Sequence, residues 1–383
     1  MHERLLSGAG AGLPGPDRDR RYSDRLVAGC KGAEPGLWSV EPLRMTYDRG
    51  VGVAEAGKRM LLGRKLKSAQ LGETLLPKRI ALPVFASDAL SSVAYAPDEI
   101  LLTLSMAGLS AYAYNWQIGV AVAIVMLTVV ASYRQNVHAY PSGGGDYEVA
   151  STNLGSTAGM TVASALLVDY VLTVAVSISS GVQNAAAALP FLHGHEALAA
   201  SVLVLLLMAM NLRGVKESGT AFAIPTYLFM ASIIGMAIWG YVRYAFGDLP
   251  KVESADLDIA PESAYAGSLS SLAMVFLLAR AFSSGCAALT GVEAISNGVP
   301  AFRRPKSRNA ATTLLLLGTI AVTMLMSILV LANITDLRYA EDPAHQLLRD
   351  GEPVGASYEQ QTVIGQLAEA IFDNDELQQI AQT

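Results

Sequence analysis

Long runs of apolar residues alternate with short polar or basic stretches from about residue 80 onward. A membrane-spanning helix needs roughly 20 mostly apolar residues, and several of these runs approach or exceed that length. The pattern predicts spanning helices at residues 81–104, 117–133, 157–189, 197–212, 222–244, 269–294 and 311–331. A shorter apolar stretch, residues 362–372, is about half the length of a span and predicts the start of an eighth.

The composition agrees with this pattern. With 52% hydrophobic and 16% charged residues, the 383-residue chain is too apolar for an ordinary soluble protein. We therefore expect an all-α polytopic membrane protein whose main partner is the lipid bilayer, with no nucleic acid. The two cysteines, Cys30 and Cys286, provide neither a disulfide framework nor a CxxC metal site.

The chain divides into three parts. Residues 1–60 are rich in Gly, Arg, Asp and Pro without apolar periodicity, which predicts a disordered tail, and both Met45 and Met60 are alternative starts. Residues 61–334 form the predicted transmembrane permease domain. Residues 335–383 are expected to be an extracytoplasmic loop followed by the start of a truncated eighth span.

Basic residues predict the orientation in the membrane. Lys and Arg gather before the first span and after the second, fourth and sixth spans, whereas the other loops are neutral or acidic. Cytoplasmic loops carry this excess, so the N-terminus is expected in the cytoplasm and the protein in the cell membrane. The N-terminus lacks the pattern of a secretory signal, so the first span is expected to direct insertion.

The first span carries Asp88, Ser91 and Ser92 in its first half. A charged side chain at membrane depth costs about 2.5 to 3.5 kcal/mol on insertion scales. We therefore expect an ion or substrate pathway here, at a helix broken near the middle of the membrane. The alternative is that Asp88 only helps helices to assemble by hydrogen bonding.

Oxygen-bearing side chains recur in three sets within the predicted spans. The sets are Asp88 with Tyr95, Asp169 with Thr173 and Ser177, and Thr290 with Glu293. The middle set is spaced i, i+4 and i+8, along one stripe of a helix. Alkali cations are held by oxygen ligands, often with carbonyls freed by unwound helices. Thr173 and Ser177 could instead bond to carbonyls of their own helix.

Three carboxylates carry more negative charge than one monovalent ion neutralises. At least one of them is therefore expected to hold a proton. A carboxylate that gains and loses a proton during a transport cycle couples transport to protons. Glu293 is the first candidate for this role and Asp169 the second, while Arg280 could simply pair with one of the carboxylates.

Several other features are weaker indicators of function. Asp98 and Glu99 follow Pro97 and could lie near an outer vestibule or in a helix kink. Three histidines in loops are expected at the surface, without a metal. They are His138, His193 and His195.

The Gly-rich stretch at residues 141–147 lacks the preceding strand and following Lys-Ser/Thr of a phosphate-binding loop. It favours tight turns or close helix contact instead. Neither a Ser/His/Asp nor an HExxH arrangement occurs at membrane depth, so the sequence does not indicate an enzyme.

The segments FASDALSSVAYAP and GCAALTGVEAISNGVP resemble the amino acid-polyamine-organocation superfamily of transporters, and more narrowly its potassium-uptake branch of KimA and KUP-type permeases. The resemblance covers roughly residues 61–334, where the three oxygen sets match in type and spacing. It implies a LeuT-like fold of two inverted five-helix repeats, with the first and sixth helices broken.

The resemblance also implies that all seven residues of the three oxygen sets bind potassium, which enters with protons and without a resident cofactor. Amino acid permeases place Gly-rich backbone at the first break, whereas Asp88 would repel a carboxylate and attract a cation. Members have about twelve spans, so this chain is expected to be a truncated form, a fragment or half of a split transporter. Two alternative functions stay open: an amino acid or polyamine permease, and a non-transporting membrane protein. A homodimer is compatible with each of these functions.

Overall fold

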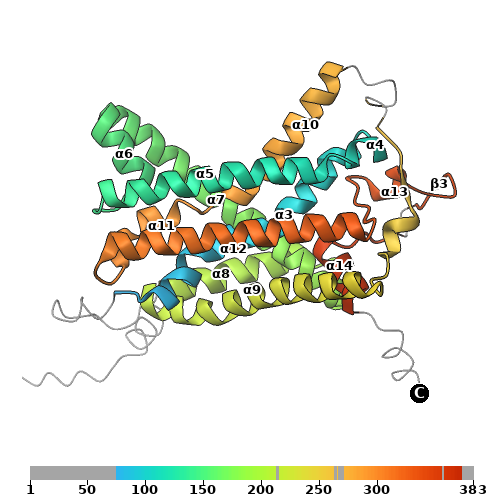
Figure 1. Cartoon of the computed structure of the whole chain (residues 1–383). Coiled ribbons are helices and arrows are strands. Elements are labelled where there is room, and N and C mark those ends of the chain that lie inside the picture. Colours follow the sequence, from blue (N-terminus) through green and yellow to red (C-terminus); the bar gives the residue numbers. More distant parts are fainter. Residues whose placement is uncertain (1–74, 213–214, 263–264, 266–270, 356–357, 373–383) are drawn as a thin grey trace, which may run out of the picture. The chain divides into compact units, whose positions relative to one another are not determined.

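The structure is a computed structural model that describes residues 75–212, 215–262, 265, 271–355 and 358–372. The predicted tail with Met45, Met60 and Cys30 lies outside the described residues, as do residues 373–383. Most of the described chain is helical (Figure 1). The longer helices are α3 (Lys78–Ser105), α5 (Asn115–Ala139), α7 (Ser156–Ala188), α8 (Glu196–Asn211), α9 (Val215–Phe246), α10 (Ser271–Gly285) and α12 (Lys306–Ile334).

Short elements connect these helices. They are α4 (Leu109–Tyr112), α6 (Gly145–Leu154), η3 (Pro190–Leu192), η4 (Glu253–Asp256), η5 (Cys286–Leu289), α11 (Ala294–Asn297), η6 (Val299–Ala301), α13 (Pro343–Gln346) and α14 (Val363–Phe372). Three short antiparallel strands form one sheet in the order β1-β2-β3, pairing Asp258 with Leu348 and Arg349 with Glu352. The strands are β1 (Asp258–Ile259), β2 (Leu347–Arg349) and β3 (Glu352–Pro353).

Six described helical segments are long and apolar enough to cross a membrane, by length and composition. They correspond to the first, second, third, fifth, sixth and seventh predicted spans. The fourth predicted span forms α8, which has 16 residues and thus rises only about 24 Å. The hydrocarbon core is about 30 Å thick, so α8 is short for a span that crosses it alone.

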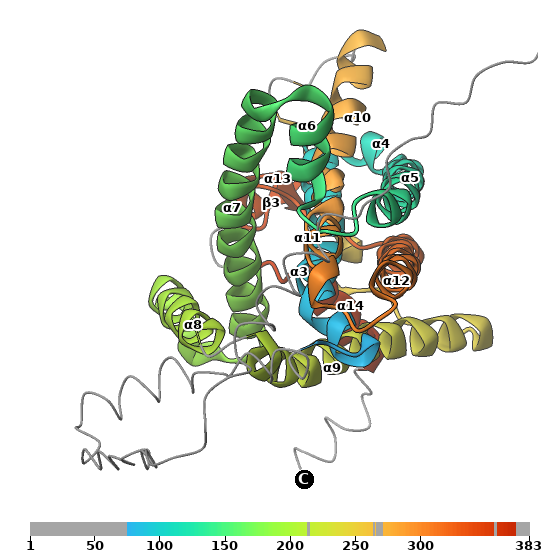
Figure 2. The ribbon, with the colours of Figure 1, turned by 90° about the vertical axis from the view of Figure 1, so that its left-hand side faces the viewer.

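Helix α3 is the central helix of this part of the chain. It contacts α5, α7, α9, α10, α11, α12 and α14. Figure 2 shows α3 and α11 between α7 on one side and the neighbouring helices α5 and α12 on the other. Because α3 is surrounded by protein, its polar side chains face other helices and not lipid.

The predicted break in the first span is wrong, because α3 is continuous from Lys78 to Ser105. The Ser91 hydroxyl donates a 2.8 Å hydrogen bond to the Asp88 carbonyl, and the Ser92 hydroxyl lies 3.1 Å from the same oxygen. Hydroxyls that bond back to carbonyls of their own helix are accommodated without unwinding it. The polar residues therefore mark a face of the helix and not an interruption.

The predicted interruption of the sixth span is confirmed. Helix α10 ends at Gly285, η5 follows, and Thr290 then adopts an extended conformation before α11 begins at Ala294. Gly291 has φ of +80°, a left-handed conformation that favours glycine. The chain thus has buried, non-helical backbone within a spanning segment, next to α3.

Candidate cation site

The structure distributes the seven predicted site residues over three elements. Asp88 and Tyr95 lie on α3, Asp169, Thr173 and Ser177 lie on α7, and Thr290 and Glu293 lie in the interruption between η5 and α11. All three elements belong to the predicted spans and contact one another through α3.

Hydroxyl groups join these elements directly. The Ser92 hydroxyl lies 2.6 Å from the Thr290 hydroxyl, and the Tyr95 hydroxyl donates a 2.9 Å hydrogen bond to Ser92. The Ser91 and Ser177 hydroxyls are 3.4 Å apart, which connects α3 to α7. The sequence pattern predicted Ser91 and Ser92 as interruptions of the helix and missed them as site residues. Their spacing from Asp88, i+3 and i+4, was the available signal, because it places them on the same face of a helix.

The three carboxyl groups share one region of the molecule. Glu293 interacts electrostatically with both Asp88 and Asp169, and Asp88 interacts with Asp169. A Cβ atom added to Gly291 would meet the Asp88 Oδ2 atom at 2.6 Å, so the carboxyl group reaches the turn itself. Within the described residues, no three acidic, His or Cys side chains lie close enough to hold one metal ion. A cation here would therefore need hydroxyl or carbonyl oxygens as well.

Glu293 is the most deeply buried of these acids. Its side chain is 8% exposed, and its Oε1 atom has no hydrogen-bond partner among the described residues. A buried acceptor without a partner costs free energy, so an arrangement of this kind favours a proton or a cation at Glu293.

The oxygen stripe of α7 faces the protein. Most apolar side chains of this helix are exposed, including Leu167, Val171 and Leu172. Thr173 is buried, and Asp169 and Ser177 are half-buried. This face is the one that meets α3, where Ser177 contacts Ser91.

A second set of polar contacts extends from Glu293 toward α6. Asn297, one helical turn beyond Glu293, donates a 2.6 Å hydrogen bond to the Tyr170 hydroxyl on α7. The Tyr133 hydroxyl on α5 donates a 2.7 Å hydrogen bond to Asp146 at the start of α6. Glu293 also interacts electrostatically with Asp146.

The Gly-rich stretch before α6 makes the close helix contact that its sequence predicted. Gly145 has φ of +49°, and a Cβ atom added there would collide with the Asn297 Oδ1 atom. Only glycine allows the loop to approach α11 this closely.

Other residues named from the sequence lie away from the three carboxyl groups. Asp98 is buried at the far end of α3, where its carboxyl group interacts with the Val363 N–H at the start of α14. Arg280 is exposed and makes no ion pair with a described carboxylate. The three predicted surface histidines are exposed; they are His138, His193 and His195.

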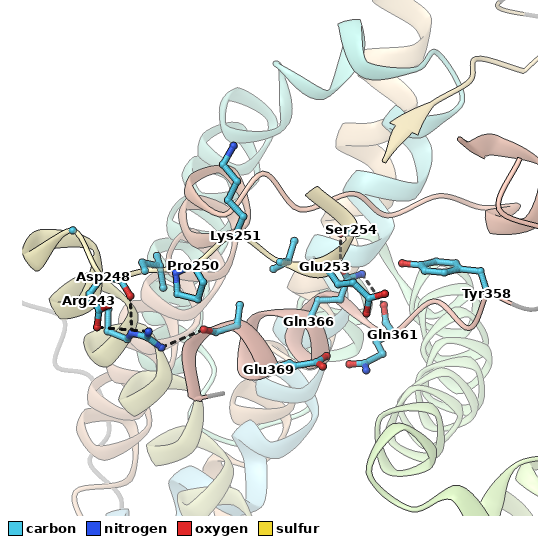
Figure 3. A pocket seen from close by; sticks show the side chains of 14 residues that line it. Arg243, Asp248, Pro250, Lys251, Glu253, Ser254, Tyr358, Gln361, Gln366 and Glu369 are labelled. Carbon is cyan, nitrogen blue, oxygen red and sulfur yellow. Dashed lines mark hydrogen bonds and ion pairs between the residues drawn. The ribbon is translucent and has the colours of Figure 1, made fainter. Parts of the chain in front are cut away.

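A cavity of about 880 Å³ lies elsewhere, between the end of α9, η4 and α14 (Figure 3). Its lining carries both signs of charge, including Arg243, Lys251, Glu253 and Glu369. Figure 3 shows Arg243 reaching the end of α14 and Ser254 bonded to Gln366. None of the seven predicted site residues lines it.

Comparison with known proteins shows the family to which this chain belongs. Residues 84–358, well over half of the chain, match the model of a family described as amino acid permease. The chain belongs to the amino acid permease family. This family is part of the amino acid-polyamine-organocation superfamily, as the sequence resemblance indicated, and a LeuT-like fold is typical of it. The permease is thus a polytopic helical membrane protein.

This permease is also similar to the potassium transporter KimA of Bacillus subtilis strain 168. The two are 45% identical over 275 residues, which are 72% of this chain and 44% of the Bacillus protein. The chain therefore spans less than half the length of this relative.

Proposed function

We propose that this permease takes part in secondary active transport of potassium into the cell together with protons. The observation that carries the proposal is the buried Oε1 atom of Glu293, which has no partner among the described residues and lies in electrostatic reach of Asp88 and Asp169. A cation or a proton is the partner that such a group requires at membrane depth.

The oxygen chemistry favours a bare cation over an amino acid. Asp88 on α3 would repel a substrate carboxylate, and the neighbouring groups of Tyr95, Ser92 and Thr290 are neutral hydroxyls. The similarity to a protein named a potassium transporter supports the same ion. The chain spans 44% of the length of that relative, so transport has to be measured with this chain itself.

Proton coupling follows from the number of acids. One monovalent cation cannot neutralise Asp88, Asp169 and Glu293 together, so a proton on one of them lowers their mutual repulsion. Glu293 is our first candidate for that proton and Asp169 the second.

The distribution of basic residues supports a cytoplasmic N-terminus. The starts of α3 and α12 lie together, because the Arg303 N–H donates to the Leu76 carbonyl and the Leu76 N–H donates to the Ala301 carbonyl. Lys78, Arg79 and Arg303 thus gather at one end of the spans, which is the pattern of a cytoplasmic end.

The proposal is tested with the purified chain in liposomes that contain a pH-sensitive dye. We expect potassium-dependent uptake with acidification of the lumen, unchanged by added amino acids and lost in Asp169→Asn and Glu293→Gln. Glu369→Gln, at an exposed acid on α14, is the matched control and should keep the wild-type rate.

Binding is measured in parallel, because the chain is shorter than its relative. A ligand that binds only the folded state raises the unfolding temperature with its concentration. Potassium should therefore stabilise the wild type and Glu369→Gln more than Glu293→Gln. The proposal is contradicted if potassium neither raises the unfolding temperature of the chain nor enters the liposomes. Uptake of a labelled amino acid without potassium would instead support an amino acid or polyamine permease.

A further inference from the structure

Ser92 is a fully buried serine at the centre of the hydroxyl contacts. It is 0% exposed and lies on α3 between Asp88 and Tyr95. Its hydroxyl contacts three groups: the Tyr95 hydroxyl at 2.9 Å, the Thr290 hydroxyl at 2.6 Å and the Asp88 carbonyl at 3.1 Å. Two of the predicted cation-binding residues therefore meet through Ser92.

The hydroxyl protons in this cluster can be counted. Each hydroxyl has one proton to donate and two lone pairs to accept with. Tyr95 donates to Ser92. If Thr290 donates to the Ala287 carbonyl, 3.0 Å away, then the proton in the 2.6 Å contact comes from Ser92. If Ser92 donates to the Asp88 carbonyl, then Thr290 donates to Ser92.

Both arrangements consume all three hydroxyl protons inside the protein. Lone pairs of Tyr95 and Thr290 remain unused in either case, because each of these oxygens accepts at most one of the bonds described. Lone pairs are what an alkali cation requires, whereas a carboxylate requires donors. The cluster therefore offers acceptors and withholds hydroxyl donors.

We propose that Ser92 is a positioning residue that directs the hydroxyl proton of Tyr95 away from the substrate, and thereby makes the site select a bare monovalent cation over a carboxylate-bearing amino acid. This inference rests on the proposed function and names a determinant of its specificity. Without the Ser92 oxygen, the Tyr95 proton loses its acceptor and can turn toward the cation, which repels it.

The test is a double-mutant cycle on the purified full chain, with potassium affinity taken from the potassium dependence of the unfolding temperature. Ser92→Ala and Tyr95→Phe should each weaken potassium binding about 10-fold, in the range expected for one buried hydrogen bond. The double variant should be no more than about 2-fold weaker than the weaker single variant, because both changes remove the same interaction. Ser105→Ala is the matched control: Ser105 is also fully buried on α3 and donates to the Leu102 carbonyl of its own helix, so its affinity should stay within about 2-fold of wild type.

A second cycle covers the case in which Ser92→Ala does not fold. Tyr95 and Thr290 are joined through Ser92, so Tyr95→Phe and Thr290→Val should also combine to less than the product of their separate effects. The inference is overturned by additive effects in whichever cycle has folded variants, or by wild-type potassium affinity in Ser92→Ala. Neither result contradicts the proposed function, because the wild-type chain still binds potassium. A wild-type chain that potassium does not stabilise overturns both this inference and the proposed function.

Discussion

Asn115 and Asn333 exchange two hydrogen bonds across the interface of α5 and α12, although 218 residues separate them in the chain. Each side-chain amide donates to the other's carbonyl oxygen, at 3.1 and 2.6 Å. The pair links two long apolar helices at one position and thereby favours one register between them. Polar side chains bonded in this way are a means by which membrane helices associate specifically.

The two asparagines differ in burial, and substitution of each should show how much their pairing contributes to stability. Asn115 is buried, whereas Asn333 is exposed and also donates to the Leu329 carbonyl. Asn333→Ala leaves a buried amide without its partner and should therefore lower the free energy of unfolding by about 1 to 3 kcal/mol. The double variant Asn115→Ala and Asn333→Ala should cost less than the sum of the single variants, by about 0.6 kcal/mol. Denaturant unfolding in detergent measures all three, and strictly additive losses would show that the amides do not act as a pair.

The turn at Gly291 should tolerate no side chain. Its φ is +80°, and an added Cβ would lie 2.6 Å from Asp88 Oδ2 and 2.9 Å from the Ala89 nitrogen. Gly291→Ala should therefore destabilise the chain by more than the roughly 1 to 2 kcal/mol of a left-handed conformation alone. Gly235→Ala is the control, because Gly235 lies inside α9, where an added Cβ would have no atom within 4 Å. That variant should be neutral or slightly stabilising, since alanine favours a helix. Equal unfolding temperatures for the two variants would contradict the described turn.

The sequence predicted the long helices well, because apolar runs of spanning length have few alternatives to a helix in a membrane. It missed α6 and the small sheet, whose short segments of mixed polarity carry no periodic signal. It also placed a break in α3 that does not exist. Serines within an apolar run do not by themselves show whether a helix is continuous, because their hydroxyls can bond to carbonyls of their own helix. The glycine of the actual interruption, Gly291, is a stronger signal, and α3 contains no glycine.

The candidate site could be predicted only in part. Oxygen-bearing side chains at helical spacing on apolar helices indicated which residues face protein, and α7 shows that arrangement at Asp169, Thr173 and Ser177. Their roles in binding remain predictions. The contact of Ser92 with Thr290 depends on how α3 packs against the interruption, and no local pattern in the sequence determines the packing of segments 198 residues apart.

Tyr112 should make stability fall at alkaline pH. It lies on α4, outside the spans, where its hydroxyl donates to the Tyr339 carbonyl and accepts a 2.9 Å hydrogen bond from the Tyr339 N–H. Burial raises the pKa of the Tyr112 hydroxyl above its ordinary value, because the charged phenolate is poorly solvated there. Above pH of about 10 the unfolded chain loses this proton and the folded chain keeps it, so the free energy of unfolding decreases as pH rises, by up to about 1.4 kcal/mol per pH unit.

The contribution of Tyr112 is isolated by comparison with Tyr112→Phe. The variant should be less stable than the wild type by about 1 to 3 kcal/mol at pH of about 8, since the Tyr339 groups lose their partner. The difference should shrink above pH of about 10, because phenylalanine has no proton to lose. Unfolding measured between pH of about 8 and about 11.5 checks this, and a constant difference across the range would contradict burial of the hydroxyl.

Arg243 should hold the end of α14 in place. Its guanidinium on α9 donates to the carbonyls of Ala370 and Ile371, at 3.3 and 2.8 Å, in the last turn of α14. A cation at a helix C-terminus satisfies free carbonyls and interacts favourably with the helix dipole. Arg243→Gln should therefore lower the hydrogen-exchange protection of α14 by about 1 to 2 kcal/mol, while α5 and α12 keep theirs, because exchange reports the opening of each segment separately. Asp248→Asn is the matched control: it removes only the 3.6 Å ion pair of Arg243 with a mostly exposed carboxylate, which is worth little. Equal loss of protection in both variants would show that the ion pair, and not the carbonyl contacts, positions Arg243. Unchanged protection of α14 in Arg243→Gln would show that packing on α3, α9 and α12 is enough to hold this helix.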